Sequence, residues 1–69
     1  MPEWSGPQPG PYPNTMEITR EGEWCNECNR KHIDRIMRRK EGESLIYSRS
    51  VGPHWMGFFN SADEAKEAK

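Results

Sequence analysis

The sequence has few of the side chains that build a hydrophobic core. Leu, Ile, Val and Phe together account for 8 of its 69 residues, a share that is typical of disordered chains when the net charge is also high. The net charge is only −1, so the chain lacks the second half of that pattern. At this length a core rarely supplies more than about 3–5 kcal/mol. We therefore expect one small domain that needs a staple, meaning a stabilising cross-link, in addition to its core.

Long apolar runs, a secretory leader and a rich set of cysteines are also missing. The longest apolar stretch, Trp55–Phe59, is far too short to cross a membrane. The first residues are rich in Pro and Gly, whereas a leader has a basic start and an apolar run. The two cysteines are fewer than small secreted proteins usually carry. These absences predict a cytoplasmic protein without a membrane partner, in which the thiols are metal ligands or redox groups.

Proline is concentrated at the start of the chain. Five of the six prolines and two of the six glycines lie in residues 1–14. Because proline lacks a backbone N–H and cannot continue a helix, this composition predicts an extended, flexible tail. No two of these prolines are three residues apart, so the P-x-x-P spacing of proline-motif ligands is absent. We expect the folded domain to occupy residues 15–69.

The middle of the chain has the pattern of an amphipathic helix. Asn29 is a favourable N-cap, and Gly42 follows where a helix often ends in a residue with positive φ. Three apolar side chains between them have the i, i+3, i+4 spacing of one helix face: Ile33, Ile36 and Met37. The sequence therefore predicts a central helix over residues 30–40.

Alternating side chains predict strands on both sides of this helix. Apolar and polar residues alternate over residues 16–19, which indicates a short strand. Residues 44–49 and 54–59 alternate in the same way. Because Gly52 and Pro53 lie between them as turn residues, these two segments are expected to form a hairpin.

A short helix is expected at the end of the chain. Ser61 and Glu64 have the spacing of a capping box, with which a helix over residues 62–69 would begin. The predicted fold is thus a small α+β domain. In it a β-hairpin and a short extra strand pack on one central helix, and a short C-terminal helix follows.

The cysteines and histidines have the spacing of a partial zinc site. Cys25 and Cys28 are separated by two residues, which is half of a common zinc motif. His32 follows Cys28 by four residues, so in a helix the two side chains share one face. His54 is the remaining Cys or His and is the candidate fourth ligand. Structural zinc contributes about 10 kcal/mol or more to folding, so it would supply the missing staple. The alternative is two reduced thiols and two ordinary surface histidines.

The segment around the cysteines also resembles the W-C-x-x-C active site of the thioredoxins: Trp24-Cys25-Asn26-Glu27-Cys28. The resemblance implies thiol–disulfide exchange by a cysteine whose pKa is lowered at a helix N-terminus. It covers five of the 69 residues, and its middle pair is Asn-Glu where thioredoxins have Gly-Pro. Only 24 residues precede Cys25, too few for the βαβ unit that a thioredoxin has there. A redox protein is therefore the alternative to a zinc module.

Positive charge is concentrated in the predicted central helix. Residues 30–40 carry a net charge of +5, against −4 for residues 1–29 and −2 for residues 41–69. If the apolar stripe faces the core, four basic side chains lie on the outward side: Lys31, Arg35, Arg38 and Arg39. Such a surface attracts nucleic acid or an acidic protein, although it can also be a solvated face. The isoelectric point near 6.1 is lower than that of most dedicated nucleic-acid binders.

Together these patterns predict a non-catalytic binding module. Zinc would fix the helix against the hairpin through four ligands: Cys25, Cys28, His32 and His54. The basic residues would bind nucleic acid or an acidic surface of a larger protein, and Trp55 and Phe58 would add apolar or stacking contacts. No small-molecule substrate is expected, because the chain has too little apolar material to wall a deep pocket.

Overall fold

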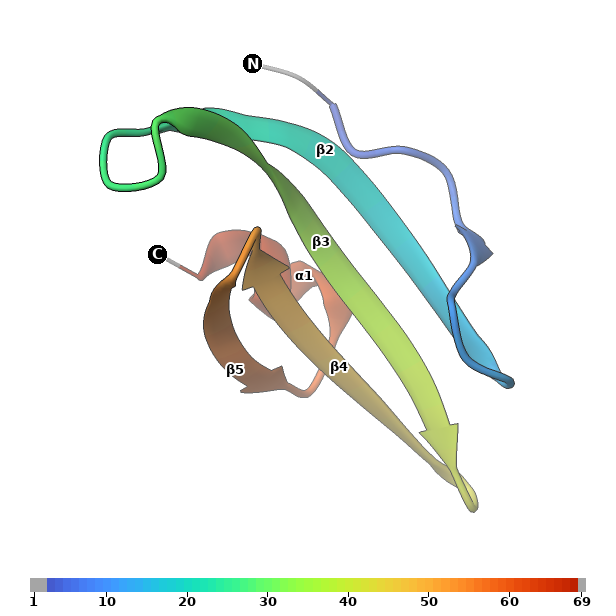
Figure 1. Cartoon of the computed structure of the whole chain (residues 1–69). Helices are drawn as coiled ribbons and strands as arrows, with labels where there is room; N and C mark the ends of the chain where they lie inside the picture. The colour runs from blue at the N-terminus through green and yellow to red at the C-terminus, as the bar shows by residue number, and fades with distance from the viewer. Residues whose placement is uncertain (1–2, 69) are drawn as a thin grey trace.

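Residues 3–68, the part of the chain that the computed structural model describes, form a five-stranded antiparallel sheet and one short helix. Met1 and Pro2 of the predicted tail and Lys69 of the predicted C-terminal helix lie outside the described residues. The strands lie in the sheet in chain order (Figure 1). The elements are β1 (Gln8–Pro9), β2 (Thr15–Cys25), β3 (Arg30–Glu41), β4 (Ser44–Val51), β5 (His54–Phe59) and α1 (Ala62–Glu67).

The central helix predicted over residues 30–40 is wrong, because this segment forms the middle strand, β3. Its burial has a period of two: His32, Asp34 and Ile36 are buried, whereas Ile33 and Arg35 are exposed. Alternation of this kind is the mark of a strand with one covered face. The fold is therefore mostly β with a C-terminal helix, and the prediction of an α+β domain built on a central helix is corrected.

Residues with positive φ close the hairpins on both sides of β3. Asn29, expected as the helix N-cap, has a φ of 56° and ends the turn between β2 and β3. Gly42 has a φ of 63° and begins the two-residue turn in which Glu41 pairs with Ser44. Asn and Gly adopt this left-handed conformation more easily than other residues. The positive φ expected at Gly42 is confirmed, but it closes a hairpin instead of ending a helix.

The other predicted strands and the C-terminal helix are present at their expected positions, although their bounds differ and the helix ends at Glu67. Residues 16–19 lie in the first half of β2, which continues to Cys25 past an irregularity between Glu21 and Trp24. β4 and β5 form the expected antiparallel hairpin. The C-terminal helix begins after Ser61, whose Oγ accepts a hydrogen bond from the Glu64 backbone N–H at 3.2 Å. That contact is the N-cap that the sequence pattern predicts.

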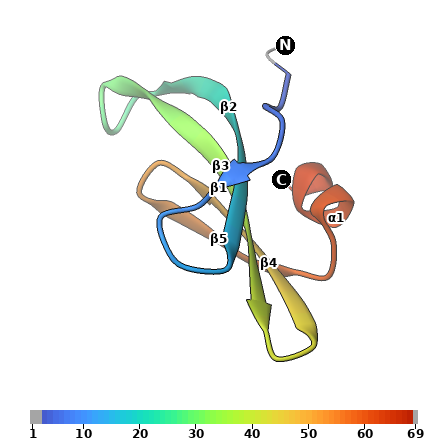
Figure 2. The same ribbon diagram turned by 90° about the vertical axis from the view of Figure 1, so that its right-hand side faces the viewer.

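The helix α1 lies over one face of the sheet, here called the helix face (Figure 2). The opposite side is called the open face. Cross-strand pairing places Ile36 between Ile18 and Arg49 on the helix face, so odd-numbered residues in the middle of β3 are on the open face. The predicted basic arc is thus divided between the two faces. Arg35 and Arg39 lie on the open face, whereas Arg38 lies on the helix face.

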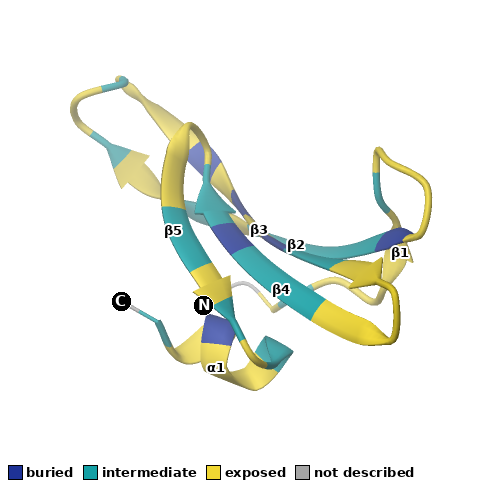
Figure 3. Cartoon of the chain, turned by 90° about the horizontal axis from the view of Figure 1, so that it is seen from below, coloured by how far each residue is buried: buried dark blue, intermediate teal, exposed yellow. Residues whose placement is uncertain are grey.

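The hydrophobic core of the described residues is very small. Ile36 and Ala65 are their only buried apolar residues, and none of their large side chains is fully buried. Most of each strand is half-buried or exposed (Figure 3). The accessible surface is 5272 Å², roughly a sixth more than a compact protein of this mass exposes. The sheet therefore needs stabilising contacts beyond apolar packing.

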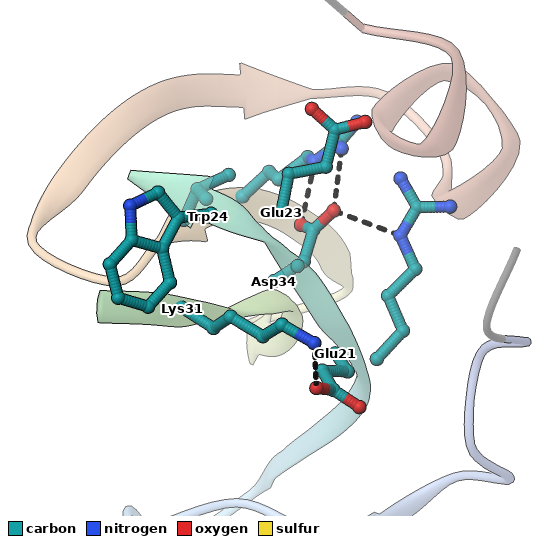
Figure 4. Close-up of a pocket in the computed structure, with 9 residues that line it drawn as sticks. Glu21, Glu23, Trp24, Lys31 and Asp34 are labelled. Carbon is teal, nitrogen blue, oxygen red and sulfur yellow. Dashed lines mark hydrogen bonds and ion pairs between the residues drawn. The ribbon is translucent and has the colours of Figure 1, made fainter. Parts of the chain in front are cut away.

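A buried ion pair joins the sheet to α1. Asp34 and Arg49 are 3% and 6% exposed, and Asp34 accepts hydrogen bonds from Arg49 Nε at 2.9 Å and Nη2 at 2.7 Å. Arg20 Nε donates a third bond to Asp34 at 3.0 Å, and the three side chains line a cavity of about 500 Å³ (Figure 4). Arg49 Nη1 also donates to the carbonyls of Ala65 and Ala68. These carbonyls lie at and just beyond the C-terminal end of α1, and the Ala65 carbonyl also accepts a hydrogen bond from the Ala68 backbone N–H at 3.3 Å.

The segment before β2 runs beside that strand. The Ser5 backbone N–H donates to the Thr19 carbonyl at 2.7 Å, and β1 pairs with the beginning of β2. The Trp4 ring lies against Arg20, whose Cζ is 4.4 Å from the ring centroid. None of residues 3–14 is buried. The flexibility of the tail stays a prediction, which a truncation tests.

A chain that starts at Asn14 should keep its sheet. The segment contributes a few backbone hydrogen bonds and the Trp4 ring, whose centroid is 4.4 Å from Arg20 Cζ and 5.7 Å from Arg49 Cζ. A contact between a cation and an aromatic ring is worth about 0.5–1 kcal/mol at an exposed site. We expect a free energy of unfolding lowered by about 1–2 kcal/mol, with amide shifts changed only in β2 and around Arg20 and Arg49. Amide correlation spectra of the two chains measure this. Loss of shift dispersion throughout β3, β4 and β5 would contradict it.

Candidate metal centre

The sheet brings together four side chains that are far apart in sequence. Cys25 ends β2, Cys28 lies in the turn that follows, and His32 is near the start of β3. His54 begins β5, where the β4–β5 turn returns the chain to the same end of the sheet. Their ligand atoms all lie within 4.8 Å of one another. The four residues are therefore close enough to bind one metal ion.

The distances in this cluster suit a tetrahedral ion. The Sγ atoms of Cys25 and Cys28 are each 3.9 Å from His54 Nε2. Zinc bonds of about 2.3 Å to sulfur and about 2.0–2.1 Å to nitrogen place a tetrahedral S–N pair about 3.6 Å apart. These two pairs are only slightly longer than that, all four ligand atoms lie within 4.8 Å of one another, and both cysteines are free thiols. A displacement of a few tenths of an ångström at each ligand would close it around the ion.

The His32 ring is a second, independent sign of a metal site, because it is buried and its nitrogens have no partner. The residue is 4% exposed, and neither Nδ1 nor Nε2 of its ring has a hydrogen-bond partner. Buried polar atoms are almost always paired, because leaving one unpaired costs about 1–3 kcal/mol. The His32 and His54 rings meet edge to face with centroids 5.3 Å apart. A metal ion bound by both imidazoles would give His32 a partner, so the residues fit the group.

Gly52 supports the His32 ring from the β4–β5 turn. Its backbone N–H donates to the Ile33 carbonyl at 3.0 Å, and its φ is 59°. A Cβ atom at this position would overlap the His32 ring at Nδ1, so the ring would have to move. The turn therefore needs glycine both for its backbone conformation and for the space that the ligand ring occupies.

Replacing Gly52 by Ala should weaken metal binding by about 10- to 100-fold, the usual effect of disturbing the residues that position metal ligands. The added methyl would push the His32 ring out of place. Competition between the protein and a chromophoric chelator for zinc measures the affinity. Gly42→Ala is the matched control, because Gly42 has a similar φ of 63° but no atom within 4 Å of the place that a methyl group would take. Equal losses in the two variants would mean that backbone strain alone is responsible.

The electrostatics of the site favour a thiolate at Cys25. The pKa of the Cys25 thiol is lowered to about 6, first by a hydrogen bond from the Cys28 backbone N–H and then by His54. The pKa of Cys28 is raised, chiefly by its contact with Cys25. Because thiolates bind metals and thiols do not, one ligand is ready at neutral pH and the second would lose its proton on binding.

Comparison with protein families, with curated proteins and with solved structures found no match to this chain. If all four side chains bound one ion, the site would have the closed coordination of structural zinc sites, whereas catalytic sites leave a position open. No helix among residues 3–68 is long and apolar enough to span a membrane.

The predicted partner-binding residues are only partly brought together. Arg35, Arg39, Trp55 and Phe58 line one hollow on the open face, with a volume of about 540 Å³. Arg38 is on the helix face, where its Nη2 contacts Met16 Sδ at 3.0 Å. Lys31 is paired with Glu21 at 3.0 Å near the β2–β3 turn. Neither of these two lines the hollow.

The hollow also contains residues that the sequence did not indicate. Its remaining lining consists of one further aromatic residue, two apolar residues and two serines: Tyr12, Met37, Ile46, Ser48 and Ser50. We call the whole set the aromatic hollow. Residues of β4 and odd-numbered residues of β3 can be recognised as neighbours in this hollow only once the two strands are known to pair. The predicted helix over residues 30–40 excluded that pairing.

Proposed function

We propose that the chain is a small zinc-stabilised β-sheet module that acts by binding a partner and has no catalytic activity of its own. The proximity of the four ligand atoms, all within 4.8 Å of one another, is the observation that supports it most. Two thiolates and two imidazoles in a tetrahedral set are typical ligands of zinc. The ion would join the β2–β3 turn to the start of β5.

The role of this ion would be structural. A module of this size with two buried apolar residues in its described part has little other source of stability. Zinc would link the β2–β3 turn, which contains Cys28, to His54 at the start of β5, two segments that are far apart in the sequence. One of the two unpaired nitrogens of His32 would gain a partner in the same step.

Binding of a partner is supported by the open face. The aromatic hollow is lined by three aromatic residues and two arginines, and no acidic residue is among its lining. Exposed apolar patches of this kind on small proteins usually mark interaction sites. Nucleic acid and the acidic surface of a larger protein are the partners that a cationic, aromatic surface would attract.

Native mass spectrometry of the purified protein tests the zinc proposal. We expect one zinc ion per chain and no reaction of the two thiols with a thiol reagent until the ion is removed. A metal-free native chain with two freely reactive thiols would refute a zinc module. The variant His54→Ala tests one ligand separately. If it binds zinc as tightly as the natural sequence does, His54 is not a ligand.

Thiol–disulfide exchange is the second candidate, and the lowered pKa of Cys25 is the observation that favours it. Cys25 ends β2 and Cys28 lies in the turn that follows, however, so neither is at a helix N-terminus as in the thioredoxins. The same mass measurement separates the two functions. A redox protein would be recovered partly as a disulfide two mass units lighter, whereas the zinc-bound thiols would stay reduced.

A further inference from the structure

We infer that the aromatic hollow binds single-stranded nucleic acid, with bases stacked on Trp55 and Phe58 and phosphates held by Arg35 and Arg39. This inference rests on the proposed binding function and names the class of its partner. It is carried by the exposure of the rings, the sign of the lining charges and the shape of the open face.

The aromatic rings of the hollow are exposed to an unusual degree. Trp55 is 60% exposed, and Phe58 and Tyr12 are each 67% exposed. Trp55 and Phe58 pack edge to face with ring centroids 5.2 Å apart and an interplanar angle of 76°. In this arrangement the two rings hold each other in place while their exposed surfaces stay available. Nucleobases stack on such rings whatever their sequence, because every base has a π-face.

The two arginines are placed to hold successive parts of a phosphate backbone. Arg35 and Arg39 are four residues apart on the same face of β3, which separates them by about 13 Å at about 3.3 Å per residue. Arg35 Nε lies 3.2 Å from Glu17, and Arg39 Nη2 lies 3.3 Å from Glu41. One such contact leaves most of the five N–H donors of a guanidinium free. Both arginine side chains are about half exposed, so a phosphate can reach them.

The floor of the hollow supplies neutral hydrogen-bonding groups. Ser48 and Ser50 lie on β4, opposite Met37 and Arg35 in the register of β3 and β4. A hydroxyl both donates and accepts, so it can pair with the edge of any base. Carboxylates would repel the phosphates, and the lining contains none. Two acids, Glu17 and Glu41, contact the arginines of the hollow, and each is paired with one of them.

The shape of the molecule favours a single strand over a duplex. The rings lie on the sheet beside a hollow, and the bases of a duplex are stacked on one another and cannot reach them. Reading a duplex groove usually takes a projecting helix or ribbon. The helix α1 lies on the opposite face, and its first turn carries Asp63 and Glu64, which would repel phosphates. An acidic protein would use the arginines but would gain little from three exposed aromatic faces.

Fluorescence anisotropy with the zinc-loaded full chain tests the inference. The probes are labelled oligothymidine and oligouridine of about twelve nucleotides, a duplex of the same length, and polyglutamate as an acidic polypeptide. We expect binding to the single strands, with quenching of tryptophan fluorescence, and much weaker binding to the duplex and to polyglutamate. Equal binding of the duplex, or preferential binding of polyglutamate, would overturn the inference.

Two sets of variants locate the binding surface. Trp55→Ala and Phe58→Ala should each weaken binding of the single strands at least about fivefold. Trp24→Ala is the control, because Trp24 is 55% exposed but lines the Asp34 cavity instead of the aromatic hollow. The double variant Arg35→Gln, Arg39→Gln should reduce the slope of log affinity against log salt by about 1.4. Arg38→Gln, on the same strand but the opposite face, should leave that slope unchanged.

Zinc content and melting temperature, measured on each variant, keep this inference separate from the zinc proposal. Variants of the hollow that stay folded and zinc-loaded but bind like the natural sequence would overturn the inference and leave the zinc module intact. If the natural chain binds single strands through the hollow without zinc, the zinc proposal is overturned and the inference about the hollow stands. A dimer that Trp55→Ala or Phe58→Ala converts to a monomer would show that a second copy occupies the hollow, which also overturns the inference.

Discussion

A strong chelator added to the zinc-loaded protein should unfold it at room temperature. Structural zinc contributes about 10–16 kcal/mol of apparent binding free energy in small domains. A core of this size rarely supplies more than about 3–5 kcal/mol, and the described part of this one contains Ile36 and Ala65 as its only buried apolar residues. Without the ion, the contacts within the sheet would not offset the loss of conformational entropy when the strands become ordered. We expect the dispersed amide spectrum to collapse on chelation and to return when zinc is added.

Single ligand variants should have the same effect as the chelator. Cys25→Ser and Cys28→Ser each remove one thiolate and should leave the chain unfolded or strongly destabilised even with excess zinc. The chelator saturated with zinc beforehand is the control for its direct effects on the protein. If the metal-free and the zinc-loaded protein melt at the same temperature, the ion is not the staple and the sheet must be stabilised in another way.

The elements predicted correctly are those with strong local signals. The β4–β5 hairpin has alternating side chains on both sides of a Gly-Pro turn, and α1 begins with a side-chain cap at Ser61. Such signals depend on neighbouring residues only, so they survive without knowledge of the tertiary structure. Cys25, Cys28 and two histidines could also be predicted as one cluster, because they are the only Cys and His residues in the chain.

The prediction for β3 is wrong for a physical reason that is visible in the strand's buried face. That face consists of His32, Asp34, Ile36 and Arg38, three of which are polar or charged. His32 is buried where it meets the two cysteines and His54, and Asp34 where it pairs with Arg49 on the next strand. Neither partner is close in sequence, so the sequence does not reveal the period of two. The remaining apolar residues happen to have helical spacing, and tertiary contacts override it.

The same error displaces the predicted binding surface. A helix would place Arg35 and Arg38 on one side, whereas a strand places them on opposite faces. The cross-strand register then brings Arg35 and Arg39 to the same face as the aromatic residues of β5, with β4 between them, an arrangement that no local pattern indicates. Trp55 and Phe58 can be recognised as candidates from the sequence, because large side chains on both faces of one strand cannot all be covered.

Replacing Asp34 by Asn should lower the free energy of unfolding of the zinc-loaded protein by about 3–5 kcal/mol. The Arg49 guanidinium would then stay buried, at 6% exposure, without a counter-charge. Removing one member of a buried ion pair is costly for this reason, even where the intact pair contributes little. Urea unfolding in the presence of zinc, followed by tryptophan fluorescence and by circular dichroism, measures the change.

Glu21→Gln is the matched control for this variant. It breaks the Lys31–Glu21 pair, which has a similar distance of 3.0 Å but side chains that are more than half exposed. Exposed pairs contribute about 0–1 kcal/mol, so this variant should unfold nearly like the natural sequence. Similar losses in Asp34→Asn and Glu21→Gln would mean that the buried pair is not what ties the sheet together.

The double variant Asp34→Leu, Arg49→Met separates the charge from the other contacts of Arg49. Replacing a buried ion pair by apolar side chains is often neutral or stabilising, so most of the loss caused by Asp34→Asn should be regained. The recovery should remain incomplete, because the Ala65 and Ala68 carbonyls lose the hydrogen bonds that Arg49 Nη1 donates. That residual loss should appear as fraying of α1, seen as faster amide exchange at residues 65–68 than in the natural sequence. Full recovery with unchanged exchange would show that Arg49 does not hold the end of α1.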